Sequence, residues 1–134
     1  MPVKYRYNPK ARILEVECSG VLVVDEIMQY FEDIRNDPSV TKEAIELVDL
    51  SRVRHFNVDF KDASSMPAGY VSAHVAKEIR ATILFGANSL NEGLAELIKA
   101  HFLHSMPDHF FTVVKTWDEA QSLAAHVHTQ RDSA

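Results

Sequence analysis

Three short apolar stretches, each followed by a segment with helical periodicity, restrict this chain to a small number of folds. The stretches are residues 45–50, 82–85 and 110–114. Each has the length of a strand, and strands that are joined through helices usually run parallel within one sheet. The order of segments therefore predicts an α/β domain with a largely parallel sheet.

The first twenty residues predict an antiparallel hairpin at one edge of this sheet. Apolar and polar residues alternate over 3–8, the pair Asn8-Pro9 marks a turn, and the alternation resumes over 14–18. A period of two with one polar face is typical of an antiparallel pair that is covered on one side only. The predicted order is β-β-α-β-α-β-α-β-α, in a mixed, mostly parallel sheet of about five strands.

Helix and loop boundaries are predicted from capping and breaking residues. Asp25 is the expected N-cap of the first helix, and residues 89–92 and 116–119 have the pattern of capping boxes. After a loop at 51–58, a helical pattern breaks near Pro67, which is expected in the first turn of a second piece. The predicted buried stripe of that piece is Val71, Val75 and Ile79.

Composition excludes some classes of protein. The chain of 134 residues has a net charge of −5, and its Lys and Arg residues are scattered, so we expect no nucleic-acid partner. No apolar run is long enough to cross a bilayer, and no secretory signal is present, which favours a cytoplasmic protein. We expect one domain over residues 1–134, with a frayed tail at 130–134. The single cysteine, Cys18, excludes an internal disulfide and is expected in the core.

The seven histidines do not form a recognisable metal site. His101 and His104 lie three residues apart on one predicted helix, but zinc requires further ligands, so we expect no metal. His101 is instead expected at the core boundary, and His74 at the edge of its helix. His126 and His128 are expected in solvent.

No motif for catalysis is present. The chain has neither a Gly-x-Ser-x-Gly turn nor a glycine-rich phosphate loop, and it contains only four glycines. One enzymatic alternative stays open, in which Ser51, His55 and Asp59 act together. The preferred interpretation is a non-enzyme with no catalytic residue and no cofactor.

Four stretches in order resemble the STAS superfamily, in its bacterial SpoIIAA-like branch. They extend from about residue 5 to residue 123 and read YRYNPKARILEVECSG, LVDLSRV, FGANSLNEGLAELIKA and FFTVVKTWDEAQSL. The resemblance implies a non-enzymatic α/β domain that binds partners, ligands or both.

The resemblance also implies where a regulatory site would lie. In anti-sigma factor antagonists of this branch, the loop after the Asp-Leu-Ser strand carries an aspartate followed by a phosphorylated serine. Here Asn57, Val58 and Asp59 occupy that place, and Val58 stands where the serine would be. Ser51 is interpreted as a turn residue at the end of the strand. The resemblance thus implies a regulatory or protein-interaction module, as a homodimer, that lacks the usual phosphoserine.

An alternative function is the binding of a small molecule or a lipid. Ligands of open parallel sheets bind beyond the carboxyl ends of the strands. The candidate residues at that edge are Arg52, Arg54, Gly86 and Asn88. An apolar cavity beneath the break at 66–67 would favour this alternative.

Overall fold

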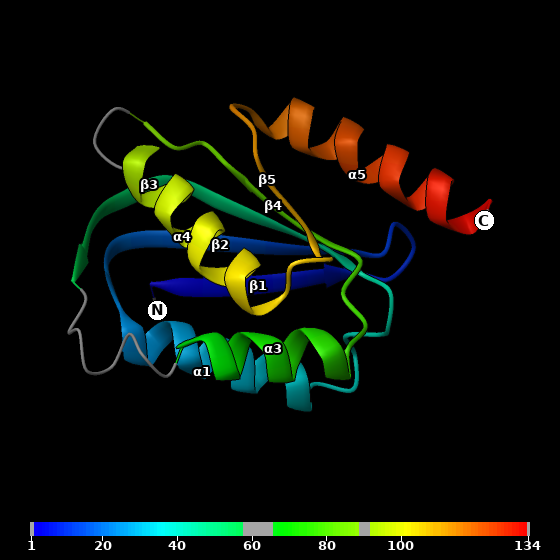
Figure 1. The fold of residues 1–134 in the computed structure, drawn as a ribbon, viewed down its shortest axis with the longest axis horizontal. Coiled ribbons are helices and arrows are strands. Elements are labelled where there is room, and N and C mark those ends of the chain that lie inside the picture. The colour runs from blue at the N-terminus through cyan, green and yellow to red at the C-terminus, as the bar shows by residue number, and fades with distance from the viewer. Residues whose placement is uncertain (1, 58–65, 89–91, 134) are drawn as a thin grey trace.

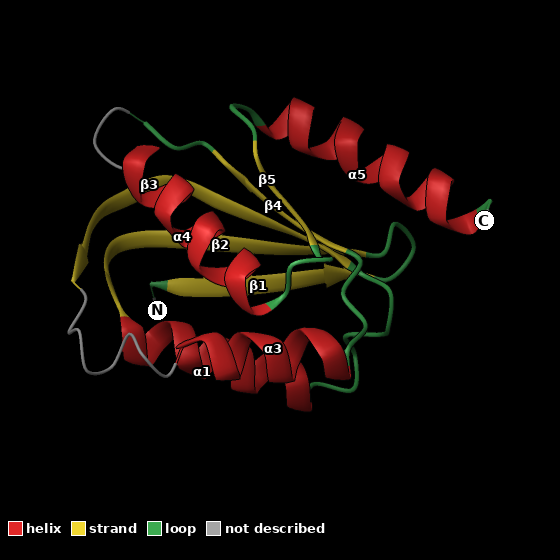
Figure 2. Ribbon diagram, viewed as in Figure 1, coloured by secondary structure: helices red, strands yellow, loops and turns green. Residues whose placement is uncertain are grey.

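The strands and helices follow the predicted order (Figures 1 and 2). The computed structural model describes residues 2–57, 66–88 and 92–133. Its elements are β1 (Val3–Asn8), β2 (Ile13–Val23), α1 (Val24–Asn36), β3 (Ile45–Asn57), α3 (Met66–Ala76), β4 (Ala81–Phe85), α4 (Glu92–Ser105), β5 (Phe110–Val113) and α5 (Trp117–Asp132).

The described strands form one mixed sheet in the order β1-β2-β3-β4-β5. β1 and β2 are antiparallel, whereas β2, β3, β4 and β5 pair in parallel. The prediction of a leading antiparallel hairpin on an otherwise parallel sheet is therefore confirmed. β1 is the terminal strand on one side and β5 on the other.

Helices cover the two faces of the sheet unequally. α1, α3 and α4 lie over one face, while α5 lies on the opposite side, against β3 and β4 (Figure 1). Successive residues of a strand point to opposite faces, so β3 and β4 contribute to both layers, which explains their nearly continuous apolar sequences. The core beneath α5 includes Ile45, Leu47 and Ile83, and the core beneath the three other helices includes Leu14, Val16 and Cys18.

Helix starts are predicted with mixed success. Thr116 is the N-cap of α5, and its hydroxyl accepts a hydrogen bond from the Glu119 amide at 3.2 Å, as predicted. The predicted N-cap at Asp25 is wrong: α1 starts at Val24, and Asp25 lies in its first turn, where a carboxylate complements the helix dipole. Pro67 occupies the first turn of α3, as predicted. Ser89 lies outside the described residues.

The predicted stripe of α3 is partly wrong. Val75 is 60% exposed. The buried face consists of Met66, Tyr70, Ala73 and His74, which follow the helical spacing i, i+4, i+7 and i+8. The prediction placed the apolar valines inside, whereas the tertiary structure places a tyrosine and a histidine there.

β3 is longer than predicted, because residues 51–57 continue the strand instead of forming a loop. The continuation pairs with β2 through two irregularities of register, the first between the pairs Glu17–Asp49 and Ser19–Arg52. At this point Leu50 and Ser51 both stand opposite Cys18, which is the arrangement of a β-bulge. A bulge interrupts the alternation of apolar and polar side chains along a strand. The sequence over residues 51–57 therefore lacks the regular alternation of a strand, and a loop was predicted there.

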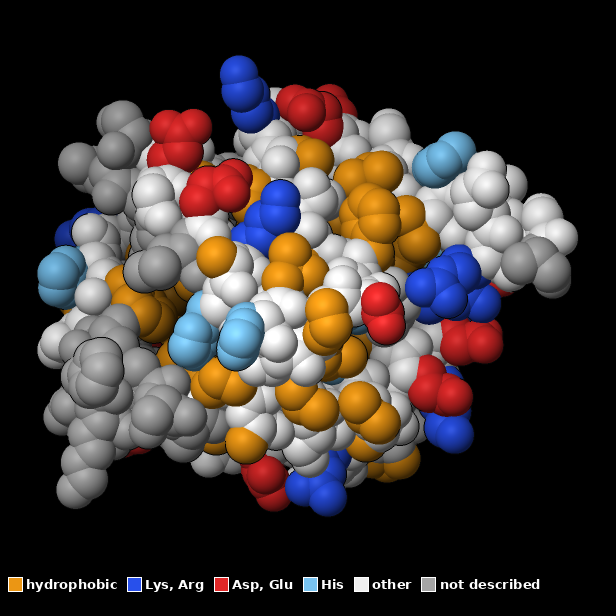
Figure 3. Space-filling model, in the orientation of Figure 1, with side chains coloured by type: hydrophobic (Ala, Val, Ile, Leu, Met, Phe, Trp, Pro, Cys, Tyr) orange, Lys and Arg blue, Asp and Glu red, His pale blue; other side chains and the backbone are white. Residues whose placement is uncertain are grey.

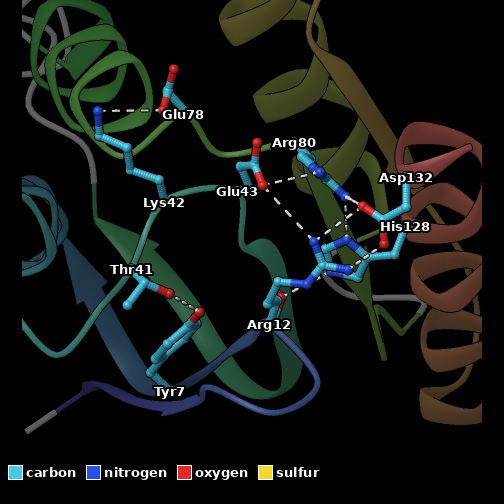
Figure 4. A network of polar contacts seen from close by, with 9 residues as sticks. All are labelled: Tyr7, Arg12, Thr41, Lys42, Glu43, Glu78, Arg80, His128 and Asp132. Atoms are coloured by element: carbon cyan, nitrogen blue, oxygen red, sulfur yellow. Dashed lines mark hydrogen bonds and ion pairs between the residues drawn. The ribbon is translucent and has the colours of Figure 1, made fainter. Parts of the chain in front are cut away.

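A network of ion pairs joins the end of α5 to the amino edge of the sheet (Figure 4). The Asp132 carboxylate accepts hydrogen bonds from Arg12 at 2.6 Å and from Arg80 at 2.9 Å. Residues 130–134 were predicted to fray, but α5 continues to Asp132 and is held there. Two bonds from guanidinium groups lower the pKa of the Asp132 carboxyl below its usual range.

His128 belongs to the same network and is buried, so its predicted exposure to solvent is wrong. Its Nε2 donates to the carbonyl of Arg12 at 3.1 Å, and its Nδ1 accepts from Arg80 at 3.0 Å. An Nδ1 that accepts must be unprotonated, so the neutral imidazole is the bound form. Burial lowers the pKa of His128.

Charged side chains of both signs are interspersed on the face formed by α1, α3 and α4 (Figure 3). Lys and Arg side chains do not gather into one patch in this view. None of the described helices is both long and apolar enough to span a membrane.

Candidate functional site

The residues predicted around the switch loop lie at the carboxyl end of β3. Ser51, Arg52, Arg54 and Asn57 are all exposed residues of that strand, and Ser51 is not a turn residue at its end. The Arg52 guanidinium pairs with Glu17 at 2.7 Å. Val58 and Asp59 lie outside the described residues.

The turn after β4 approaches this segment closely. Gly86 has φ +77°, and a Cβ built there would lie 3.0 Å from Asp49 Oδ1 and 3.1 Å from the Cβ of Ser51. Gly86, a predicted crevice residue, and Ser51, from the predicted switch region, are therefore neighbours. Asn88 follows in the same turn and is exposed.

This close approach predicts that Gly86→Ala is costly. A left-handed backbone and a crowded Cβ should together lower the free energy of unfolding by about 2–3 kcal/mol. Gly20→Ala is the matched control, because Gly20 has φ +66° with no atom near its Cβ, and should cost about 1 kcal/mol. Urea denaturation of both variants measures the difference, and equal losses would mean that the turn has room for a side chain.

A buried polar cluster lies between the sheet and the three helices, away from the predicted edge. Its centre is the carboxylate of Glu46 on β3, which is 2% exposed. His74 Nε2 and the Thr82 hydroxyl each lie 2.9 Å from Glu46 Oε1, and the Tyr30 hydroxyl donates to Oε2. The His109 Nε2 lies 3.0 Å from the Thr82 hydroxyl and extends the cluster toward the surface.

The hydrogen bonds of His74 place a proton on one of its two ring nitrogens. Its Nδ1 lies 2.7 Å from the carbonyl oxygen of Tyr70, which can only accept, so Nδ1 carries a proton. Burial alone would raise the pKa of Glu46, but the charge of His74 and hydrogen bonds from His74, Tyr30 and Thr82 outweigh it and lower that pKa. The Glu46 carboxyl is thus ionised, and His74 Nε2 lies within hydrogen-bond distance of it. Both side chains are enclosed in the core.

Burial also shifts the neighbouring groups. It raises the pKa of the Tyr30 hydroxyl, helped by the charge of Glu46, so Tyr30 stays a donor. It lowers the pKa of His109 to about 4, with a contribution from the charge of His74, so His109 is neutral near pH 7. Burial raises the pKa of the Cys18 thiol to about 12, so this cysteine is not a nucleophile.

A cavity of about 80 Å³ adjoins the cluster. Apolar side chains make up most of its wall, and Glu46, Tyr30 and Thr82 form its polar part. The Tyr70 hydroxyl faces Thr82 without a well-formed hydrogen bond and has no partner among the described residues. Met66 also lines the cavity, which places it beneath the start of α3, where a cavity was expected to favour ligand binding.

The other histidines lie apart from this cluster. His101 and His104 are exposed on α4, so the predicted boundary position of His101 is wrong. His55 and His126 are exposed as well. Within the described ranges, no group of three His, Cys, Asp or Glu side chains is arranged to hold a metal ion.

Sequence reasoning missed the buried cluster, although two signals point to it. Glu46 is an isolated carboxylate in a central apolar strand, where a charge requires a partner. His74 falls on the helical face that Met66 and Tyr70 define. A search for polar residues on the buried face of α3 finds His74. Its partner, Glu46, can be identified only from the three-dimensional structure.

Comparisons with known proteins identify the fold. No protein-family model matches the chain, and neither does any curated protein. An uncharacterised protein from Shewanella loihica PV-4, of the DUF3478 family with a SpoIIAA-like fold, superposes with a TM-score of 0.57 at 14% identity over 91% of each chain. The anti-sigma factor antagonist SpoIIAA in its unphosphorylated form superposes with a TM-score of 0.52 at 13% identity, over 88% of this chain and 93% of the other.

These two likenesses confirm the fold class predicted from the sequence motifs. The chain has a SpoIIAA-like α/β fold over most of its length. At such identities the likeness concerns the fold, and function must be argued from the site.

Proposed function

We propose that this chain is a non-catalytic regulatory module that acts in the cytoplasm by binding a protein partner. The observation that carries this proposal is the likeness to an anti-sigma factor antagonist over nearly the whole chain. The chemistry of the site agrees with a non-catalytic role, because the buried Glu46 and His74 are closed to solvent. Ser51 and His55, the described members of the enzymatic alternative, are exposed to water.

The proposed module differs from a phosphoserine switch. Val58 stands at the position of the modified serine and has no hydroxyl group. A phosphate adds up to about two negative charges at such a site, and a valine cannot carry one. The proposed partner therefore reads an unmodified surface at the carboxyl end of β3, formed by Ser51, Arg52, Arg54 and Asn57.

A charge reversal at that end tests the proposal. With the tagged protein as bait in lysate of its native cell, Arg54→Glu should reduce recovery of the partner about tenfold, because the substitution reverses a charge within the proposed docking surface. Lys10→Glu is the control, since Lys10 is exposed in the hairpin turn at the opposite edge. Light scattering of the purified protein gives the oligomeric state, for which we propose a dimer. A strict monomer that recovers no partner contradicts the proposal.

The cavity supports a second candidate function, the binding of a small, mostly apolar molecule. A buried hydroxyl without a partner is costly, and a ligand oxygen that accepts from Tyr70 would satisfy it. The volume of about 80 Å³ is smaller than the ~150 Å³ cavity that binds benzene, so the fit is to a short-chain carbonyl compound.

Titration with short ketones tests this candidate. Acetone and 2-butanone should shift amide resonances around the cavity, and Tyr70→Phe should weaken binding about fivefold through the loss of one hydrogen bond. Tyr7→Phe, at the hairpin, is the control. Shifts that are absent, or that are the same in the Tyr70 variant, would leave the cavity as a packing defect or a water site.

A further inference from the structure

A groove of about 610 Å³ runs along the outer edge of the sheet, between β1 and α1. Its apolar floor consists of Pro2, Val3, Tyr5 and Tyr30. Its α1 wall carries Asp25, Glu26, Gln29 and Asp33. Val3 and Tyr30 line both this groove and the internal cavity.

The backbone of β1 faces this groove with free hydrogen-bonding groups. The Ser19 amide donates to the Pro2 carbonyl at 2.8 Å, so these two opposite residues form a hydrogen-bonded pair. Hydrogen-bonded pairs alternate along an antiparallel ladder, and the next one is therefore Lys4 with Glu17. The alternate residues Val3 and Tyr5 then direct their N–H and C=O groups away from β2. No described strand pairs with this side of β1. An edge of this kind is a template for one more strand.

The charge of the groove restricts what it can accept. Three carboxylates on α1 face a single cation, Lys4. Glu26 Oε2 is shielded from solvent and has no hydrogen-bond partner among the described residues. Asp33 accepts one bond, from Gln29 at 2.8 Å. The wall therefore favours cationic donors.

We propose that this groove binds an extended, basic segment of a partner protein, which adds to the sheet as a strand antiparallel to β1 and places Lys or Arg side chains against α1. The inference rests on the proposed regulatory function and names the chemistry of one further segment of that partner, which the groove binds in addition to the surface at the end of β3. Backbone hydrogen bonds to Val3 and Tyr5 give the segment its register. The carboxylates of Glu26 and Asp33 give it a preference for alternating basic residues.

A second copy of this chain fits the groove poorly. Pairing of two β1 strands would bring Lys4 and Arg6 of both copies together on one face of the sheet. On the other face it would bring the α1 carboxylates of both copies together. Like charges on neighbouring strands oppose association of two copies. Basic residues on an edge strand commonly prevent such self-pairing.

A labelled peptide of about seven residues that alternates lysine and valine is the probe, with fluorescence anisotropy as the measurement. Glu26→Gln combined with Asp33→Asn should weaken binding about tenfold, because two charge pairs with the peptide are lost. Glu96→Gln combined with Asp118→Asn removes the same charge from exposed positions on α4 and α5 and should leave binding unchanged. Exchange of lysine for glutamate in the peptide should abolish binding.

Methylation of the peptide backbone separates strand addition from simple charge attraction. In antiparallel addition, the residues whose side chains face α1 also direct their amides toward β1, so N-methylation of the lysines should abolish binding. N-methylation of the valines should preserve it. The proposal is overturned if both methylated peptides bind like the parent, if the acidic peptide binds equally well, or if β1 mediates dimerisation.

The outcomes also separate this site from the proposed function. If the Glu26/Asp33 variant recovers the native partner as well as the wild type does, the groove is not the docking site, and the regulatory function stands. If neither protein recovers a partner, the proposed function itself fails.

Discussion

Replacement of His74 with phenylalanine is expected to lower the free energy of unfolding by about 3–5 kcal/mol. The substitution leaves the Glu46 carboxylate in the core without the imidazole that pairs with it, and the nearby hydroxyls of Tyr30 and Thr82 cannot neutralise its charge. The aromatic ring fits the site, which already packs against Tyr70 and Phe31, so loss of packing is a minor part of the effect. Urea denaturation with a constant m-value measures the change.

Two further variants isolate the electrostatic cause. His101→Phe makes the same exchange at an exposed position of α4 and should change stability by less than about 0.5 kcal/mol. In the His74→Phe background, Glu46→Gln removes the unpaired charge and should restore part of the loss. If the second substitution adds its full cost instead, Glu46 is not an ionised partner of His74 in the native protein.

The second large effect expected is a loss of stability in mild acid. Burial holds the pKa of His109 at about 4 in the folded chain, against about 6.5 in an unfolded one. The unfolded state therefore binds the proton first as the pH falls. The contribution of His109 is complete above pH ~6.5 and is lost between ~6.5 and ~4, by about 2–3 kcal/mol. The pKa of His128 is shifted in the same direction.

Denaturation curves at pH 7.5, 5.5 and 4.5 measure this slope. His109→Gln cannot take up a proton and should flatten the profile, at the cost of some stability at pH 7.5. His104→Gln, which alters an exposed histidine on α4, should leave the profile as in the wild type. A wild-type stability that stays constant down to pH 4.5 would show that His109 is accessible to water.

The sequence predicts the architecture well because periodicity and turn residues are local signals. The alternation over 3–8 and 14–18 and the capping pattern at 116–119 each depend on residues that are near in the chain. Such signals do not report which face of a helix the sheet will cover. Val75 is apolar and is predicted to be buried, but it is exposed in the structure. His74 is buried instead, because its side chain pairs with the buried Glu46.

The site was predicted less well, for a related reason. Ser51 and Gly86 lie close together because strands of a parallel sheet end at a common edge. The Glu46 cluster joins residues 16 to 36 positions apart, and no local pattern encodes such pairs. The bulge opposite Cys18 likewise depends on the register between two strands.

One consequence follows from the position of Glu46. Its two oxygens hold α1 through Tyr30, α3 through His74 and β4 through Thr82. A motion of α3 alone would separate His74 from the buried Glu46 carboxylate, and a motion of α1 alone would remove the Tyr30 hydroxyl from it. The two helices are therefore coupled through one side chain, and neither can move away from the sheet without breaking a hydrogen bond in the core.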